Sequence, residues 1–322
     1  MPRNLHSSPL LAGAFGALLV LGVAAAPAAS ATSPGRNGII VFGADRGSGY
    51  QLWTVRPNGT SLRQITAVDG DAVHPDWAPD GFSLVFELDH PAGTPYCSVV
   101  VISADGSGAR DLTPPTFAGC EAQPSFTPDG TRVVFQQYDE TTGVDAIWSM
   151  DLAGADRREI TRGTGTGVTD PNVSPDGRTL SFVDVTGSDF EQALFSVRLA
   201  DGSDLRQLTA FSTDVAVKHD WAPDAKHIVF TDNADFPHET DSANVEVIRP
   251  DGTGLRPLTH FTGGDRSGFA GSYSPDGHYI AFRLESGGLY GLYRMDTKGR
   301  AVHAILPLST LKPRYIDWSS AG

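Results

Sequence analysis

A short segment recurs five times along the chain, and this repeat restricts the fold more than any other feature. Each copy places an aromatic residue or valine before a Pro-Asp turn and closes on phenylalanine, as in HPDWAPDGFSLVF at residues 74–86. The turn prolines stand 47 to 52 residues apart, at Pro79, Pro128, Pro175, Pro223 and Pro275. A repeat of this length is typical of a four-stranded β-propeller blade.

Each repeat is predicted to form four β-strands joined by tight turns. Proline presets φ early in the turn, and the glycine after the aspartate accepts a left-handed backbone. The fifth repeat carries Ala225 in place of this glycine, so we expect that turn to be less stable. An apolar third strand and a fourth strand ending in Ile-Thr or Leu-Thr complete each repeat.

The two ends of the chain supply complementary parts of one more repeat. Residues 35–45 contain a second strand ending on phenylalanine but no first strand, whereas residues 314–322 contain a first strand with Trp318 but no second strand. The predicted fold is therefore an all-β, six-bladed β-propeller of four-stranded blades. Its ring is closed by pairing of the N- and C-terminal strands, which removes open sheet edges. The second-strand phenylalanines are Phe42, Phe86, Phe135, Phe182, Phe230 and Phe282.

The repeated text resembles that of TolB-type propellers, and the resemblance covers about residues 36–322. It implies a TolB-like propeller, but it is weak evidence for function because this propeller recurs in unrelated roles. TolB itself is a periplasmic partner of a peptidoglycan-associated lipoprotein and carries an α/β domain before its propeller. Only seven residues separate Ala31 from Ile39 here, so we expect that domain to be absent.

The N-terminus has the pattern of a secretory signal peptide. Arg3 precedes an apolar run at residues 10–26, and Ala-Ser-Ala follows at residues 29–31. This order predicts a cleaved signal peptide at 1–31 and a single propeller domain at 32–322, in a protein that is secreted, periplasmic or in the cell envelope. The alternative is an uncleaved anchor, since 17 apolar residues are at the short limit of a membrane span. No membrane span is predicted in the mature chain.

The net charge limits the kinds of partner that the protein can bind, and its cysteine content indicates the cellular compartment. The formal net charge of −14 excludes tracking of nucleic acid or anionic membranes. It fits either a basic partner or plain solubility, and we expect a monomer that binds an extracytoplasmic protein or glycan. The two cysteines, Cys97 and Cys120, are predicted to form a disulfide in an oxidising compartment, with unpaired buried thiols as the alternative.

Binding residues are expected where the longer, more variable connections share one face of the propeller, such as residues 87–97, 136–145 and 231–244. First strands line the channel of a propeller, so their polar residues are the candidates at its mouth. Carboxylates that converge at the channel mouth could bind Ca²⁺. The alternative is a water-filled tunnel without a metal. No other cofactor is expected. The candidates are His74, Asp76, Gln123, Asp170, Lys218, His219, Asp220 and Asp317.

Motifs for catalysis are missing from the sequence. It has no G-x-S-x-G elbow, no H-E-x-x-H pair and no phosphate-binding loop, and no catalytic residue is predicted. The first hypothesis is a non-enzymatic binding module. The alternative is a metal-assisted polysaccharide lyase or hydrolase using His74 and His219 at the channel mouth, as lyases on related propellers do. The same histidines are otherwise ordinary rim residues.

Overall fold

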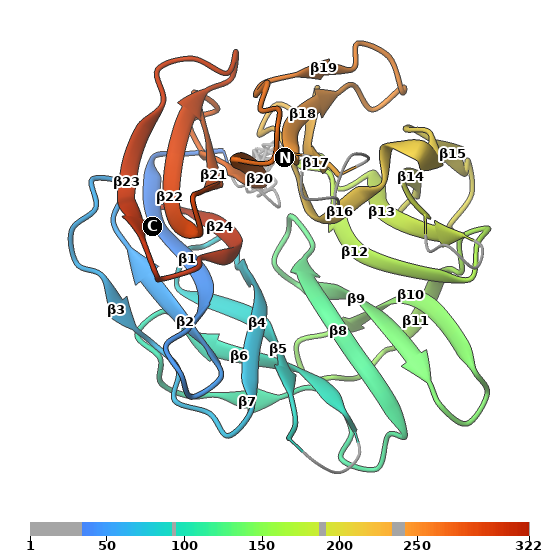
Figure 1. Cartoon of the computed structure of the whole chain (residues 1–322). Coiled ribbons are helices and arrows are strands. Elements are labelled where there is room, and N and C mark those ends of the chain that lie inside the picture. Colours follow the sequence, from blue (N-terminus) through green and yellow to red (C-terminus); the bar gives the residue numbers. More distant parts are fainter. Residues whose placement is uncertain (1–33, 92–94, 187–190, 234–241, 322) are drawn as a thin grey trace, which may run out of the picture.

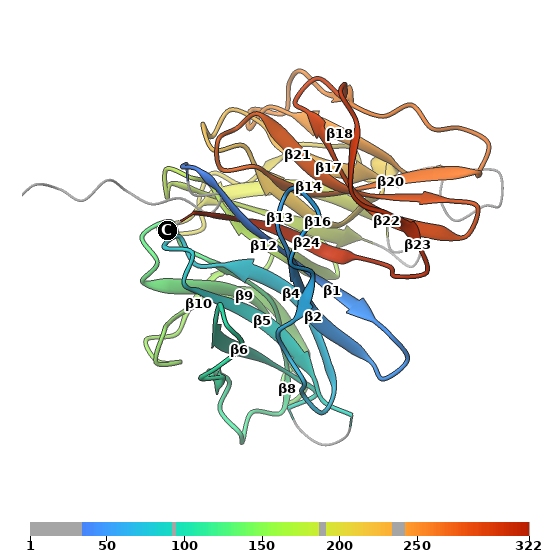
Figure 2. The ribbon, with the colours of Figure 1, turned by 90° about the vertical axis from the view of Figure 1, so that its left-hand side faces the viewer.

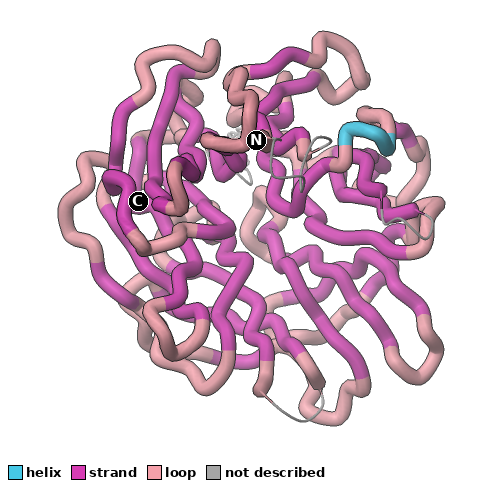
Figure 3. Tube along the Cα trace, viewed as in Figure 1, coloured by secondary structure: helices cyan, strands magenta, loops and turns pink. Residues whose placement is uncertain are grey.

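The structure is a computed structural model that describes residues 34–91, 95–186, 191–233 and 242–321. The predicted signal peptide lies outside these residues. The described chain is almost entirely β-strands and turns; its one helical element is the single turn η1 (Phe211–Thr213) (Figure 3). The sheets are arranged around a common axis, so the fold is an all-β propeller (Figure 1).

Strands from both ends of the chain share one four-stranded sheet. Its order is β24 (Arg314–Ser320), β1 (Asn37–Asp45), β2 (Tyr50–Val55), β3 (Arg63–Gln64). β1 pairs antiparallel with β24, and Ile40 lies opposite Trp318, as the alignment of the two ends predicts.

Three further sheets have four strands each, in the order of the chain. The first is β12 (Gly167–Val173), β13 (Thr179–Thr186), β14 (Glu191–Arg198), β15 (Arg206–Gln207). The second is β16 (Val215–Trp221), β17 (Ile228–Asp232), β18 (Asn244–Ile248), β19 (Arg256–Pro257). The third is β20 (Arg266–Tyr273), β21 (Tyr279–Ser286), β22 (Leu289–Asp296), β23 (His303–Ser309).

The remaining repeats join into one eight-stranded sheet, which differs from the predicted count of six separate sheets. One half is β4 (Asp71–Trp77), β5 (Ser83–Asp89), β6 (Cys97–Ser103), β7 (Arg110–Asp111). The other is β8 (Gly119–Phe126), β9 (Arg132–Asp139), β10 (Val144–Asp151), β11 (Arg158–Thr161). A single parallel pair, Cys97 opposite Cys120, connects β6 to β8. The same two residues form the predicted disulfide, with Cα atoms 4.7 Å apart, within the reach of such a bond.

The strands nearest the axis are the first of each repeat: β4, β8, β12, β16, β20 and β24 (Figure 1). In the side view, β24 and β1 lie between β20–β23 and β4–β6 (Figure 2). The core fills the spaces between neighbouring sheets rather than one central volume. The second-strand phenylalanines are each at most 1% exposed, so they belong to this core.

The Pro-Asp-Gly turns have the predicted backbone. Gly81, Gly130, Gly177 and Gly277 all have φ between 66° and 71°. Ala225 adopts φ 57° in the fifth repeat, a left-handed conformation that is costly for a residue with a Cβ atom. The repeat therefore imposes the same turn even where the sequence departs from glycine.

Candidate functional site

Connections of different length share the face opposite the Pro-Asp-Gly turns, which we call the long-loop face. β5 ends at Asp89 and β6 begins at Cys97; β17 ends at Asp232 and β18 begins at Asn244. Residues 136–145, predicted as a long loop, are mostly paired in β9 and β10 instead. The face that bears the Pro-Asp-Gly turns, which we call the tight-turn face, has hollows of about 500 and 450 Å³ between its turns.

The three aspartates predicted to line the channel join neighbouring sheets. Asp76, Asp220 and Asp317 are each at most 4% exposed. One carboxylate oxygen of each accepts a hydrogen bond from the backbone N–H of the next innermost strand. The donors, each 2.8 Å away, are Phe126 for Asp76, Tyr273 for Asp220 and Trp77 for Asp317. These side chains therefore stabilise the contact between first strands.

Gln123 and Asp170 make equivalent links. The side-chain oxygen of Gln123 accepts from the backbone N–H of Asp170 at 2.6 Å. Asp170 in turn accepts from the backbone N–H groups of Lys218 and His219 and contacts the His219 ring nitrogen Nδ1 at 2.7 Å. Burial alone would raise the pKa of Asp170, but the charges of His219 and Lys218 outweigh it and lower that pKa to about 2.

His219 is buried rather than exposed at the rim, whereas His74 is only partly buried, with 12% of its side chain exposed. His219 is 0% exposed, and its second ring nitrogen lies 2.6 Å from the Ser181 hydroxyl. His74 contacts Glu87 at 2.7 Å and packs its ring 3.7 Å from that of Tyr315.

A β-bulge in the innermost strands explains these unexpected side-chain directions. Register shifts interrupt the pairing of β4, β8, β12, β16 and β20 with their second strands. A bulge kinks its strand and re-aims the side chains beside it. Left-handed φ values between 46° and 91° mark the equivalent position in β4, β8, β12, β16 and β24, at His74, Gln123, Asp170, Lys218 and Tyr315, whereas Ala270 in β20 lacks one.

Very little space remains on the axis among these residues. The cavity lined by His74, Asp76, Gln123, Asp170 and Lys218 measures about 10 Å³, room for roughly one water molecule. Lys218 is 7% exposed. Burial lowers its pKa, but Asp317, Asp76 and other nearby acids outweigh burial and raise it. Lys218 thus places a positive charge beside the carboxylates that were candidates for Ca²⁺.

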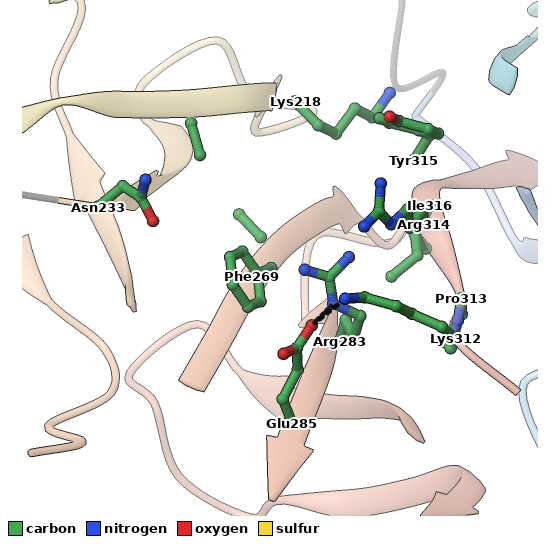
Figure 4. Close-up of a pocket in the computed structure, with 12 residues that line it drawn as sticks. Lys218, Asn233, Phe269, Arg283, Glu285, Lys312, Pro313, Arg314, Tyr315 and Ile316 are labelled. Atoms are coloured by element: carbon green, nitrogen blue, oxygen red, sulfur yellow. Dashed lines mark ion pairs between the residues drawn. The ribbon is translucent and has the colours of Figure 1, made fainter. Parts of the chain in front are cut away.

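A larger cavity lies beside the channel on the long-loop face. It measures about 260 Å³ and is bounded by β16, β20, β21 and the start of β24. We call it the basic pocket because Lys218, Arg283, Lys312 and Arg314 line it together with one carboxylate, Glu285. The guanidinium groups of Arg283 and Arg314 point into the same space (Figure 4).

Burial and repulsion between neighbouring cations lower the pKa values of two basic side chains in the pocket. The Arg283 side chain is 11% exposed, and its Nε lies 2.8 Å from a Glu285 oxygen. Lys312 approaches the same oxygen at 3.3 Å. Burial, reinforced by the charge of Arg314, lowers the pKa of Arg283 to about 10 although Glu285 opposes the shift. Burial likewise lowers the pKa of Lys312.

Of the residues in this pocket, only Lys218 was a candidate from the sequence. Arg283 directly follows the second-strand phenylalanine Phe282, and the equivalent position after Phe86 is Glu87, which holds His74. This position lies near the channel mouth at Arg283 and Glu87, but Val183, which follows Phe182, is packed in an apolar cluster between sheets. Comparing this column among repeats would have exposed Arg283 as an unusual cation.

The described residues offer little evidence for a metal site or for a membrane-spanning helix. Within the described ranges, one group of three potential metal ligands lies close together, Glu87 with Cys97 and Cys120, and its sulfurs are joined in the disulfide. Among the same residues, no helix is long and apolar enough to cross a membrane.

Partial relatives of the chain include two bacterial proteins, and no protein-family model matches the chain. The chain is 31% identical over 112 residues to the uncharacterized peptidase YuxL of Bacillus subtilis, matching 34% of this chain and 16% of the relative. It is 29% identical over 154 residues to a TolB homolog of Chlorobium luteolum, matching 48% of this chain and 31% of the relative. The match thus spans less than a third of either relative.

Comparison with solved structures defines the fold. TolB from Acinetobacter baumannii superimposes with a TM-score of 0.71 at 19% identity, covering 88% of this chain and 67% of that one. A putative TolB from Agrobacterium tumefaciens gives a TM-score of 0.63 at 16% identity, covering 89% and 99%. The chain therefore has the fold of a TolB-type β-propeller.

Proposed function

We propose that this chain is an exported binding module whose basic pocket, on the long-loop face, receives part of an extracytoplasmic protein or glycan. The cavity of about 260 Å³ carries the proposal. It admits a side chain or a sugar ring, whereas the space of about 10 Å³ on the axis does not. The predicted axis residues then hold the propeller together and the pocket beside them engages the ligand.

We also infer a single domain at residues 32–322 with six blades in a closed ring. The eight-stranded sheet divides into two groups of four strands joined by one bridge. Six apolar clusters each pack neighbouring groups of strands against each other. The cluster beside the terminal strands contains Phe42 and Trp318 together with Ala281 and Leu292, which supports closure there.

Two further features are consistent with a protein that is extracytoplasmic and monomeric. The Cys97–Cys120 disulfide fits an oxidising compartment, whether the protein is secreted, periplasmic or held in the cell envelope after loss of a signal peptide. The outer strands β3, β7, β15 and β19 contain two residues each. These four short edges discourage pairing with another copy, whereas the outer strand β11 contains four residues and the outer strand β23 contains seven.

The metal-assisted lyase or hydrolase gains no support from the described part of the chain. Both ring nitrogens of His219 are engaged, by Asp170 and Ser181, so a metal would have to displace these bonds. We propose that Lys218, rather than Ca²⁺, balances the acids on the axis.

Filling the pocket tests the proposed function. Ala216 lines the basic pocket, and Ala200 lines the hollow of about 500 Å³ on the tight-turn face. We expect Ala216→Phe to abolish capture of envelope or culture-fluid ligands by the immobilised protein, with an unchanged circular dichroism spectrum. Ala200→Phe is the matched control and should capture as the wild type does. Loss of capture in Ala200→Phe with retention in Ala216→Phe would place binding on the opposite face.

A further inference from the structure

The charges in the basic pocket indicate which chemical group it takes. Building on the proposed function, we propose that the pocket binds a carboxylate of an acidic polypeptide segment through Arg283 and Arg314. The group is either an aspartate or glutamate side chain or a chain-terminal carboxylate, which present the same chemistry.

The first argument is that the pocket holds more positive charge than the described residues balance. The charge of Lys218 is already opposed by acids on the axis. Arg283 and Lys312 both contact Glu285, and no carboxylate within the described residues lies within ion-pair distance of Arg314. Holding partly buried cations together without a counter-ion is costly, and a bound anion offsets that cost.

The second argument is that hydrogen-bond donors remain unused. The Nε atoms of Arg283 and Arg314 are buried and lack a hydrogen-bond partner in the described chain. The contact of Arg283 with Glu285 is close but not aligned as a hydrogen bond. Phe269 packs against the guanidinium of Arg283, 3.9 Å from the ring centre, which keeps the group oriented. Fixed guanidinium donors suit the planar geometry of a carboxylate.

Exposure distinguishes this pocket from the tight-turn face, where arginines also gather. Arg178, Arg198 and Arg206 line the hollow there, but all three are exposed. Water screens exposed charges, so they need no counter-ion and give little specificity. In the basic pocket the arginine charges are largely buried, so they interact more strongly with a bound anion and discriminate better between ligands.

The walls of the pocket favour a carboxylate on a carbon stem. Phe269, Pro313 and Ile316 supply apolar surface beside the guanidinium groups. Methylene groups can contact these walls, whereas phosphate presents oxygen on every side.

The wider charge distribution favours a polypeptide over an acidic polysaccharide. The chain has a net charge of −14, and Asp71 lies on the same long-loop face. A polymer with a charge on every unit would meet this repulsion as soon as it left the pocket. A polypeptide needs only one carboxylate at the pocket and can be neutral or basic elsewhere.

The test follows the arginine Nε–H signals of the ¹⁵N-labelled full chain by NMR. The probes are acetate, phosphate and three short Gly-Ser peptides: one with an internal glutamate and amidated end, one with only a free C-terminus, and one neutral. We expect acetate and both charged peptides to shift the Arg283 and Arg314 signals and to raise the melting temperature, and the neutral peptide to do neither. Which charged peptide binds more tightly identifies the source of the carboxylate.

Variants complete the test. Arg314→Gln, which keeps a polar side chain at the half-buried site, should weaken peptide binding about tenfold, the loss of one charge-assisted contact. Arg178→Gln, an exposed arginine on the opposite face, should bind like the wild type. The proposal is overturned if the neutral peptide binds equally, if phosphate or an oligogalacturonate binds more tightly than the charged peptides, or if no probe moves either signal. If capture still depends on Ala216 when these probes fail, the binding module stands and only the carboxylate is wrong.

Discussion

The axis of the propeller and the basic pocket beside it are both polar, yet their side chains are used differently. On the axis, Asp76, Gln123 and Asp170 accept hydrogen bonds from the backbone of the next innermost strand. In the pocket, the buried Nε atoms of Arg283 and Arg314 make no hydrogen bond to the described residues, although that of Arg283 lies 2.8 Å from a Glu285 oxygen. The comparison teaches that polarity at a channel mouth does not identify a binding site. Three residues around the axis, His74, Ser125 and Asn172, also have a buried atom without a hydrogen-bond partner among the described residues. The two regions therefore differ in the space and the cationic charge that they offer, and not only in whether their polar groups are satisfied.

Removing an axis side chain should give the largest loss of stability. Asp170→Ala leaves two backbone N–H groups and the His219 ring without their acceptor in a buried site. We expect the free energy of unfolding to fall by about 3 to 5 kcal/mol, measured by urea denaturation. Native Asp170→Ala protein should still respond to acetate at the pocket.

Asp69→Ala supplies the control, because that aspartate is exposed and should be substituted with little effect on stability. The distinction between axis and pocket fails if Asp170→Ala unfolds no more easily than Asp69→Ala, or if Arg314→Gln destabilises the fold as strongly as Asp170→Ala does.

The disulfide offers a second, slightly smaller test of the same distinction. Cys97 and Cys120 join β6 to β8, far along the chain from the strands of the pocket. Replacing both by alanine removes a cross-link between residues 23 apart, which should cost about 3 kcal/mol. Thermal unfolding with and without reductant measures this, and the double variant should no longer respond to reductant. A reductant-insensitive wild type would show that the bond contributes nothing to stability.

Much of the fold was predictable because the repeat is expressed in local chemistry. Turn residues fix the hairpins, and an apolar residue at a constant position fixes the core, so Phe42 through Phe282 were placed correctly. Spacing could not predict that Cys97 and Cys120 would also pair as neighbouring strand residues and join two repeats into one sheet. That bridge depends on how two loops approach each other in space.

The site was harder to predict because bulges decide where side chains point. His219 and Lys218 are adjacent, yet one is sealed between sheets and the other lines the pocket. The pocket also assembles Arg283 and Arg314, which belong to different repeats and follow no common motif. Only the closing of the propeller brings such residues together, so sequence spacing alone gave one of its four cations.

The smallest expected effect on stability concerns Asp89, which pairs with Asp71 at what we call the acidic edge of the long-loop face. Unlike the pocket, this edge is expected to make the stability of the protein depend on pH. Burial, with the charge of Glu87, raises the pKa of Asp89 to about 8, far above the usual value of about 4. Below pH 4 the folded and unfolded chains both hold this proton, and the stabilising contribution is complete. Between pH 4 and 8 the folded chain alone retains it, so the contribution is lost as the pH rises.

Asp89→Asn should therefore remove this pH dependence, because the amide keeps a donor toward Glu87 and carries no charge. We expect the melting temperature of the variant, relative to the wild type, to rise between pH 5 and pH 9, and Asp69→Asn to show no such trend. Acetate binding at the basic pocket should be the same in both proteins at pH 7, where Asp89 is largely neutral. A constant difference in melting temperature across this range would mean that Asp89 ionises normally. The acidic edge would then carry a full negative charge at neutral pH and repel an anionic ligand more strongly.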